Sequence, residues 1–371
     1  MARINFSDNL TAKGRQLHLQ THVSEDGDER VHTLFDGGRV LRRIAVPLAR
    51  SESEERQFQE AHVAHEEMRS EIELLYQVSV RIKTVRHAPS LLALGRLFLK
   101  WRLLDEAVSE LELARIMVSS STEGLLDLSE AFRLRGGLQE ALAALETGLK
   151  KTTGYADFWV RKGQIEVQMG QWQAAQESCA EALKRNPDYG EAYLRVAHVL
   201  LLACGTEIDV QSRKAQMDKA REQLGRAIHR GGLGGAEPEA VVRMLHKGDW
   251  EKAAAALESW LDRRPWALRL DDHDRFYLDY LYGEQGRDSQ RIQAYVQGLE
   301  ETVDNHPGYA DLHNRLGVAY MIQCRQLLTQ AIAHFQTALR LNPSYKRAKR
   351  NLQLVKNDSK GFLILLRALL K

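Results

Sequence analysis

The sequence is poor in cysteine, in proline and in long hydrophobic runs. Its three cysteines, Cys179, Cys204 and Cys324, have spacings that fit no zinc knuckle, and an odd number cannot all pair. We therefore expect reduced thiols rather than a disulfide framework. No stretch approaches the roughly 20 apolar residues of a bilayer span, and the first residues lack the apolar core of a secretion signal. The predicted location is the cytoplasm, with no transmembrane segment.

Net charge is also nearly absent, because 52 basic residues face 50 acidic ones and leave a formal charge of +2. Such a balance disfavours general binding to nucleic acid or to an anionic membrane, although local basic patches remain allowed. The apolar share of 44% is ordinary for a soluble chain. Composition therefore predicts a soluble protein that does not bind nucleic acid.

What the sequence does contain is a repeat with a period of 34 residues. Alanine recurs at Ala107, Ala141 and Ala175. A large residue, followed four positions later by a small one, recurs at the same interval: Leu91 and Gly95, Leu125 and Ser129, Trp159 and Gly163, Tyr193 and Ala197. A large residue packs between helices, and a small one lets a neighbouring helix approach. The pattern predicts stacked helix–turn–helix units.

The pattern resembles the tetratricopeptide repeat (TPR) family over about residues 88–345. The third copy carries most of the family's positions: Trp159, Gly163, Gly170, Ala175, Ala182 and Pro187. The resemblance implies a mainly all-α fold, a right-handed α-solenoid of about seven TPR-like helix–turn–helix repeats. The fourth copy contains about ten extra residues within 205–214. A fifth copy runs to Pro265, the sixth is degenerate, and the pattern of the seventh, up to Pro343, is clear again with two residues inserted.

Residues 1–48 are predicted to form a small antiparallel β module. Leu17, Leu19 and Thr21 alternate with polar residues, a period of two that suits a half-buried strand. Asp36-Gly37-Gly38 separates two further strand patterns and is typical of a tight hairpin turn. A sheet of this size is marginal alone, so we expect it to pack on the next helix, to pair with a partner or to self-associate.

Residues 49–87 are predicted to form a long helix. Its apolar residues follow a heptad seam, interrupted by His65 and Ser79. The seam residues are Phe58, Ala61, Met68, Ile72, Leu75 and Ile82. The pattern fits a connecting helix that lays its seam on the first repeat, and it also fits a coiled-coil dimer; two polar breaks favour the connecting helix.

Residues 346–371 are predicted to form a basic capping helix and an apolar tail. Lys346, Arg347, Lys349 and Arg350 are the densest basic cluster, which we interpret as a solvated helix rather than a nucleic-acid contact. The tail from Gly361 is too short to span a membrane. It either covers the end of the solenoid, which we favour, or docks on a partner or bilayer surface.

In the TPR family, the first helix of each repeat lines a concave groove that binds peptides. The resemblance implies the following partner-binding residues, here called the predicted groove: Leu92, Arg96, Leu99, Lys100, Leu126, Glu130, Arg133, Val160, Gln164, Gln168, Leu194, His198 and Leu201. Their mixture of apolar and polar side chains suits an extended or helical peptide. Leu92 and Arg96 stand where one subgroup has a lysine and an asparagine that grip chaperone tails, so we do not expect that ligand.

Other clusters contain residue types that could carry chemistry, but a structural interpretation fits each of them better. His18 and His22 share a strand face and could be joined by His32 as a zinc set, but exposed strand histidines are more often simply polar residues. The run 271–274 is acidic and fits a helix start better than a metal site. The run Gly231 to Gly235 lacks the residues of a phosphate loop and fits a helix stop. We expect no catalytic residues, no metal and no cofactor.

The predicted function is therefore that of a non-catalytic scaffold or adaptor, which captures a protein or peptide partner in the groove. One alternative is a self-assembling adaptor driven by the β module and the heptad helix. Another is the regulatory subunit of an enzyme, sensing a ligand or metal through the β module.

Overall fold

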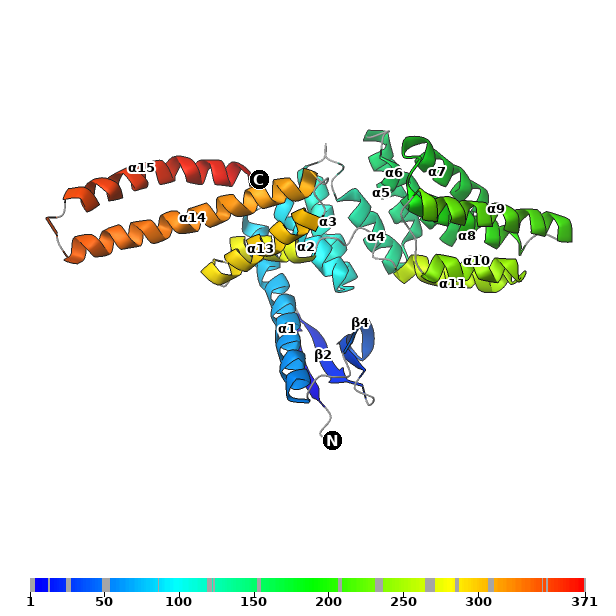
Figure 1. Ribbon diagram of the computed structural model, residues 1–371, viewed down its shortest axis with the longest axis horizontal. Helices are drawn as coiled ribbons and strands as arrows, with labels where there is room; N and C mark the ends of the chain where they lie inside the picture. Colours follow the sequence, from blue (N-terminus) through cyan, green and yellow to red (C-terminus); the bar gives the residue numbers. More distant parts are fainter. Residues whose placement is uncertain are drawn as a thin grey trace. The chain divides into compact units, whose positions relative to one another are not determined.

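A computed structural model describes most of the chain. The described residues are 4–12, 14–24, 28–48, 54–85, 87–118, 122, 124–151, 155–205, 209–230, 236–263, 271–283, 287–305, 310–341, 343–344 and 346–369. These residues form four strands and fifteen helices (Figure 1). The predicted fold class, a TPR-like helical array with a small antiparallel β module, is confirmed.

The chain divides into two compact units. Unit 1 combines residues 1–38 and 43–93 with the carboxyl-terminal segment 272–371. Unit 2 contains residues 39–42 and 94–271. Segments that lie far apart in the sequence therefore share unit 1, whereas unit 2 is nearly continuous.

The β module is a meander with the strand order β1-β2-β3-β4. Its strands are β1 (Asn5–Ala12), β2 (Arg15–Val23), β3 (Glu29–Asp36) and β4 (Arg39–Pro47). The β1–β2 and β2–β3 pairs are antiparallel. Gly37 and Gly38, with φ of 53° and 84°, form the predicted hairpin turn between β3 and β4. The alternation along β2 buries Leu17, Leu19 and Thr21, as its period of two predicts.

Helix α1 (Glu54–Val85) packs on β1 and β2. Much of its predicted seam is internal to the chain: the buried seam residues are Ala61, Ile72, Leu75 and Ile82. The two polar breaks, His65 and Ser79, are buried as well. Phe58 is 49% exposed and contacts Phe6, with ring centroids 5.2 Å apart. A seam buried within one chain favours the connecting-helix interpretation over a coiled-coil dimer.

Four helices complete unit 1. They are α12 (Asp271–Tyr282), α13 (Ser289–Asn305), α14 (Ala310–Leu341) and α15 (Lys346–Leu369). The seventh repeat copy differs from expectation, because its two helices are fused into the single helix α14. Helix α15 runs back beside α14, so the two form a long hairpin (Figure 1). On α15, Phe362 packs against the cluster of Tyr280, Ile292 and Ile322, and the side chains beyond it lie outside the described residues.

The turn glycine explains this difference. In earlier copies the turn between the two helices contains a glycine at positive φ: 91° at Gly136, 74° at Gly170 and 84° at Gly248. The first copy has Arg102 in this slot, at φ 59°. In the seventh copy Cys324 lies at the corresponding place, and no glycine or proline follows until Pro343. Without a residue suited to the turn, the helix continues.

Unit 2 is a stack of helix pairs. Their bounds are α2 (Ala88–Lys100), α3 (Leu104–Met117), α4 (Leu125–Arg135), α5 (Leu138–Lys151), α6 (Ala156–Gln168), α7 (Trp172–Arg185), α8 (Gly190–Ala203), α9 (Val210–His229), α10 (Ala236–His246) and α11 (Trp250–Arg263). Residues 88–93 of α2 belong to unit 1. Each helix from α3 to α8 packs on the next helix in the chain. The contact between α9 and α10 is smaller. None of the described helices combines the length and apolar composition that a bilayer span requires.

The small slot of the 34-residue pattern has the predicted role. A β-carbon added at Gly95 would lie 2.6 Å from the Leu111 side chain of the paired helix. At Gly163 it would lie 2.9 Å from the Cys179 sulfur. Both distances are too short for real contacts, so the glycines permit the close approach of paired helices.

Gly148 marks an even tighter contact, which gives a test of the packing. An added β-carbon there would lie 2.1 Å from the Phe158 ring, so Gly148→Ala should lower the free energy of unfolding by about 1–3 kcal/mol. Gly225 is the matched control: it lies in the interior of α9 with nothing within 4 Å of an added β-carbon, so Gly225→Ala should raise stability by up to about 1 kcal/mol. Urea denaturation followed by tryptophan fluorescence measures both. Equal effects of the two substitutions would contradict the packing.

The fourth copy accommodates its extra residues by lengthening its second helix. Helix α9 has 20 residues, whereas α7 has 14. Asp209 caps α9 by accepting a hydrogen bond from the Ser212 amide at 2.8 Å. The fifth pair then packs in an unexpected order, because α11 contacts α8 while α10 contacts α9.

Candidate functional site

Ion pairs in unit 2 cross from one first helix to the next. Arg96 on α2 donates from Nε to Asp127 on α4 at 2.8 Å. Arg161 on α6 donates from Nη1 to Glu130 on α4 at 2.7 Å. Both pairs join residues that are 31 positions apart. If the first copy is counted from residue 88 and each later copy from 34 residues further on, the ninth residue of one copy pairs with the sixth residue of the next. These pairs tie neighbouring first helices together.

Glu130 is the centre of a buried charge cluster. Besides Arg161, it accepts two hydrogen bonds from Arg133, from Nε at 2.7 Å and from Nη2 at 2.9 Å. Gln164 accepts a further hydrogen bond from Arg161. Arg161 is 1% exposed, and burial lowers its pKa to about 10, so it stays cationic at neutral pH. Burial alone would raise the pKa of Glu130, but the charge of Arg161 and the hydrogen bonds from Arg133 outweigh it and hold that pKa below its usual value.

The residues of the predicted groove fall into a buried group and an accessible group. The buried group is Leu92, Leu99, Glu130, Val160, Gln164, Leu194, His198 and Leu201. The accessible group is Arg96, Lys100, Leu126, Arg133 and Gln168. Three members of the accessible group carry positive charge and none carries negative charge. The charged members of the accessible group are therefore all cations, and two of them, Arg96 and Arg133, pair with Asp127 and Glu130.

Helix α8 is buried almost all round. Its residues from Ala192 to Leu201 are buried without interruption, which covers the full circumference of a helix. Helix α11 contacts α8, in addition to the neighbours α6, α7 and α9. This packing accounts for the burial of Leu194, His198 and Leu201.

His198 is neutral in this environment. Burial, with a further contribution from the charge of Arg195, lowers the pKa of His198 to about 4. Among the described residues, its Nε2 finds no hydrogen-bond partner. Arg195 itself pairs with Glu191 four residues earlier, at 2.8 Å.

A second polar cluster lies between the β module and α1. His65 Nε2 lies 3.0 Å from Asp8 Oδ2, and His65 Nδ1 lies 2.8 Å from the hydroxyl of Thr21. The same hydroxyl is 2.8 Å from Nδ1 of His32, whose Nε2 accepts from Arg30 at 3.2 Å. With Nε2 of His65 and Nδ1 of His32 as donors, every contact in this chain joins a donor to an acceptor. The hydrogen bond to His65 is the main cause of a lowered Asp8 pKa, and burial lowers the pKa of His32 to about 4.

The order carboxylate, imidazole, hydroxyl matches the chemistry of a nucleophilic triad, but the geometry does not allow catalysis. Thr21 is fully buried, so no substrate can reach its hydroxyl. The cluster therefore joins the sheet to α1 as a structural network.

The candidate zinc set of His18, His22 and His32 is wrong. The strand register pairs His32 with Thr21, whereas His18 faces Phe35 and His22 faces Val31. Because side chains alternate between faces, His32 lies on the opposite face from His18 and His22. Within the described part of the chain, no group of three or more His, Cys, Asp or Glu residues is placed to hold a metal ion.

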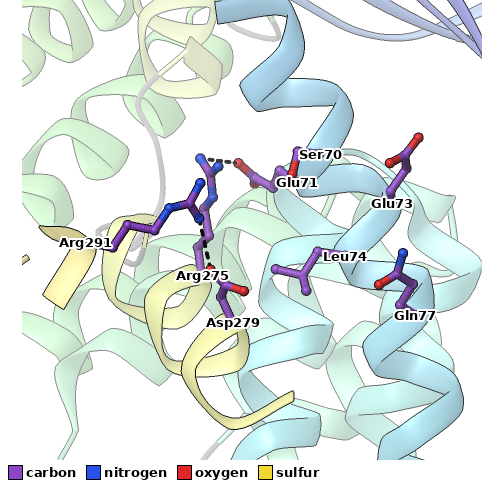
Figure 2. A pocket seen from close by; sticks show the side chains of 8 residues that line it. All are labelled: Ser70, Glu71, Glu73, Leu74, Gln77, Arg275, Asp279 and Arg291. Atoms are coloured by element: carbon purple, nitrogen blue, oxygen red, sulfur yellow. Dashed lines mark hydrogen bonds and ion pairs between the residues drawn. The ribbon is translucent and has the colours of Figure 1, made fainter. Parts of the chain in front are cut away.

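A cavity of about 200 Å³ in unit 1 lies between α1, α12 and α13 (Figure 2). Arg275 is 3.4 Å from Glu71, and Arg291 donates to Asp279 at 3.1 Å. In Figure 2, Arg275 of α12 points toward Glu71 of α1, and Arg291 of α13 points toward Asp279 of α12. Since each arginine already faces a carboxylate, the charges of the cavity are largely compensated and we assign it no ligand.

The structure describes most of the remaining residues that the sequence analysis singled out. Helix α12 begins at Asp271, as the acidic helix-start reading predicts. The basic residues from Lys346 to Arg350 are exposed on α15. The glycine run 231–235 lies outside the described residues. Cys179 and Cys204 are buried thiols and Cys324 is an exposed one.

Comparison with known proteins supports the TPR resemblance. Residues 160–203 match the tetratricopeptide repeat family. None of the curated protein sequences compared with the chain matches it. Among solved structures, MamA aligns at 17% identity and a TM-score of 0.32, covering 52% of this chain and 97% of MamA.

Two further structures are similar. PilF of Pseudomonas aeruginosa aligns at 14% identity and a TM-score of 0.37, covering 61% of this chain and 95% of PilF. A tetratricopeptide repeat protein from Parabacteroides merdae aligns at 17% identity and a TM-score of 0.35, covering 72% of this chain and 98% of that protein. The chain has the TPR-like repeat fold, which generally serves as a protein-interaction scaffold.

Proposed function

We propose that this chain is a non-catalytic scaffold that binds an acidic segment of another protein on the first-helix face of unit 2. The observation that carries the proposal is that the charged residues at the accessible positions of the predicted groove, Arg96, Lys100 and Arg133, are all cations. These cations stand on helices that interhelical ion pairs already hold together. A preorganised surface loses little entropy when it binds a ligand.

The charge of the surface defines the partner. Arg96 and Arg133 each pair with a carboxylate, which orders their side chains, and a guanidinium group carries five N–H donors. Carboxylates are the groups that guanidinium ions recognise best, often through two hydrogen bonds. The proposed ligand is therefore a peptide segment rich in Asp or Glu, with apolar residues that can contact Leu126.

A peptide-library selection on the immobilised chain tests this proposal. We expect acidic peptides to be selected, and their affinity, measured by fluorescence anisotropy, to fall at least tenfold in the double variant Arg96→Gln plus Arg133→Gln. The matched control, Arg115→Gln plus Arg226→Gln, removes two exposed cations from second helices of the same unit and should leave affinity unchanged. Selection of peptides without acidic residues, or equal losses in both double variants, would refute the proposal. Helical circular dichroism shows that the variants remain folded.

A further inference from the structure

The packing of α11 departs from the repeat pattern in a way that points to a ligand. In a regular stack, the first helix of one copy would contact the first helix of the next, as α4, α6 and α8 do. The fifth copy instead brings its second helix, α11, against α8. In Figure 1 the α10–α11 pair lies along α8 and α9.

One face of α11 is apolar and is buried together with α8. Its buried residues are Ala253, Ala254, Leu257 and Leu261. They belong to the same hydrophobic cluster as Leu194 and Leu201 of the predicted groove. The opposite face, which includes Glu251, Ala255, Glu258 and, at the carboxyl end, Asp262, is exposed. Helix α11 is therefore an amphipathic helix seated by its apolar face, the mode by which helical peptides bind grooves.

The two ends of α11 reach different repeat copies. At its start, the Trp250 ring lies against Gly205 at the end of α8, and the Arg213 guanidinium is 5.9 Å from that ring. At its other end, the carboxylate of Asp262 acts electrostatically on Arg133 of α4 and on Arg102. Helix α11 thus begins beside the fourth copy, and the charge near its other end acts on arginines of the first and second copies.

Simple lengths agree with this placement. Helix α11 has 14 residues, so it is about 21 Å long. Helices α4 and α8 are two steps apart in the stack, and packed helices lie about 8–10 Å from each other, which gives about 16–20 Å between them. A helix of this length can cross the first-helix face from α8 to α4.

We infer that α11 is an intramolecular ligand of the predicted groove, and that an external partner is an amphipathic helix of the same design. This inference rests on the proposed function and names its partner class: a helix with Ala and Leu on one face and a carboxylate near its carboxyl end. The carboxylate would act on Arg133, which already lies within the electrostatic reach of Asp262 of α11. Two of the four buried residues of α11 are alanines, so its apolar contact is small and a partner helix with larger residues can displace it.

The test uses the full-length chain and a fluorescein-labelled peptide with the sequence of residues 249–263. In the wild-type chain α11 competes with the peptide. In Asp262→Arg the internal helix is repelled by Arg133, so the peptide should bind at least tenfold more tightly by fluorescence anisotropy. Glu258→Arg is the matched control, because it makes the same charge change one helical turn earlier on the same exposed face of α11, whereas the charge that acts on Arg133 is that of Asp262; it should bind the peptide as weakly as the wild type does. A peptide that carries arginine at the position of Asp262 should bind the Asp262→Arg chain no more tightly than it binds the wild-type chain.

A second variant keeps the test decisive. Leu257→Ala weakens the apolar seat of α11 without touching its charges, and it should also raise peptide affinity if helical circular dichroism is retained. Equal peptide affinities in the wild type, Asp262→Arg and Leu257→Ala would overturn the inference. If acidic peptides from the library still depend on Arg96 and Arg133 in that case, the proposed function stands and only the role of α11 falls.

Discussion

Replacing Glu130 by glutamine is expected to lower the free energy of unfolding of unit 2 by about 3–5 kcal/mol. Glu130 accepts a hydrogen bond from Arg161 at 2.7 Å, and Arg161 is 1% exposed. Without the carboxylate, the Arg161 charge stays buried with much less compensation, because glutamine offers one neutral oxygen and presents an NH2 group to guanidinium donors. The loss exceeds that of a surface ion pair, which contributes at most about 1 kcal/mol.

Urea denaturation followed by tryptophan fluorescence measures this effect selectively. All six tryptophans of the sequence lie between residues 94 and 271, so their fluorescence reports unit 2. Glu146→Gln on the exposed surface of α5 is the matched control and should change stability by less than about 0.5 kcal/mol. Adding Arg161→Met to Glu130→Gln should recover part of the loss, because the buried charge is then removed as well. A double variant no more stable than Glu130→Gln would contradict the assigned pairing.

Acidification is expected to destabilise unit 2 by about 2 kcal/mol between pH 7 and pH 5, because one pKa unit corresponds to about 1.4 kcal/mol. The group responsible is His198, whose pKa burial lowers from 6.5 to about 4. Between these values the unfolded chain binds a proton that the folded chain excludes. Stability is therefore complete above pH 6.5 and is lost as the pH falls toward 4. The window above pH 5 avoids the lowered pKa of Glu130, whose contribution is lost only at lower pH.

The same denaturation experiment, repeated at each pH on histidine variants, isolates this contribution. His198→Gln should flatten the pH dependence between 7 and 5. His229→Gln, which removes an exposed histidine of the same unit, should leave the dependence as it is in the wild type. A dependence that survives His198→Gln unchanged would show that another group titrates. In unit 1, His32 should act in the same direction, because burial and the charge of Arg30 lower its pKa to about 4.

The repeat architecture could be predicted from the sequence because its cause is local. The first and third copies place a glycine where two helices touch, and a β-carbon added at Gly95 or Gly163 would clash with the paired helix. The hairpin at Gly37 and Gly38 was predictable for the same reason, since it depends on backbone freedom at two adjacent positions. The fused helix α14 could also have been predicted, because the seventh copy lacks the turn glycine of its predecessors.

The candidate site was predictable only in part. The family resemblance identifies first-helix positions, but it does not show which of them stay accessible. A spacing of 31 between Arg96 and Asp127, repeated between Glu130 and Arg161, is visible in the sequence and could have indicated the interhelical ion pairs. The network of Asp8, Thr21 and His65 carries no such signal, because it joins residues 44 to 57 positions apart at no repeated interval.

By itself, the sequence determined the period, the helix pairs, the β module and the positions that face a neighbouring copy. These features depend on side-chain size and backbone freedom within about one repeat length. Only the tertiary structure decided that both ends of the chain share unit 1, that His32 lies on the opposite strand face from His18, and that α11 covers α8. The physical reason is that such contacts depend on register and packing between distant segments, where burial and charge pairing, rather than local pattern, select the partner.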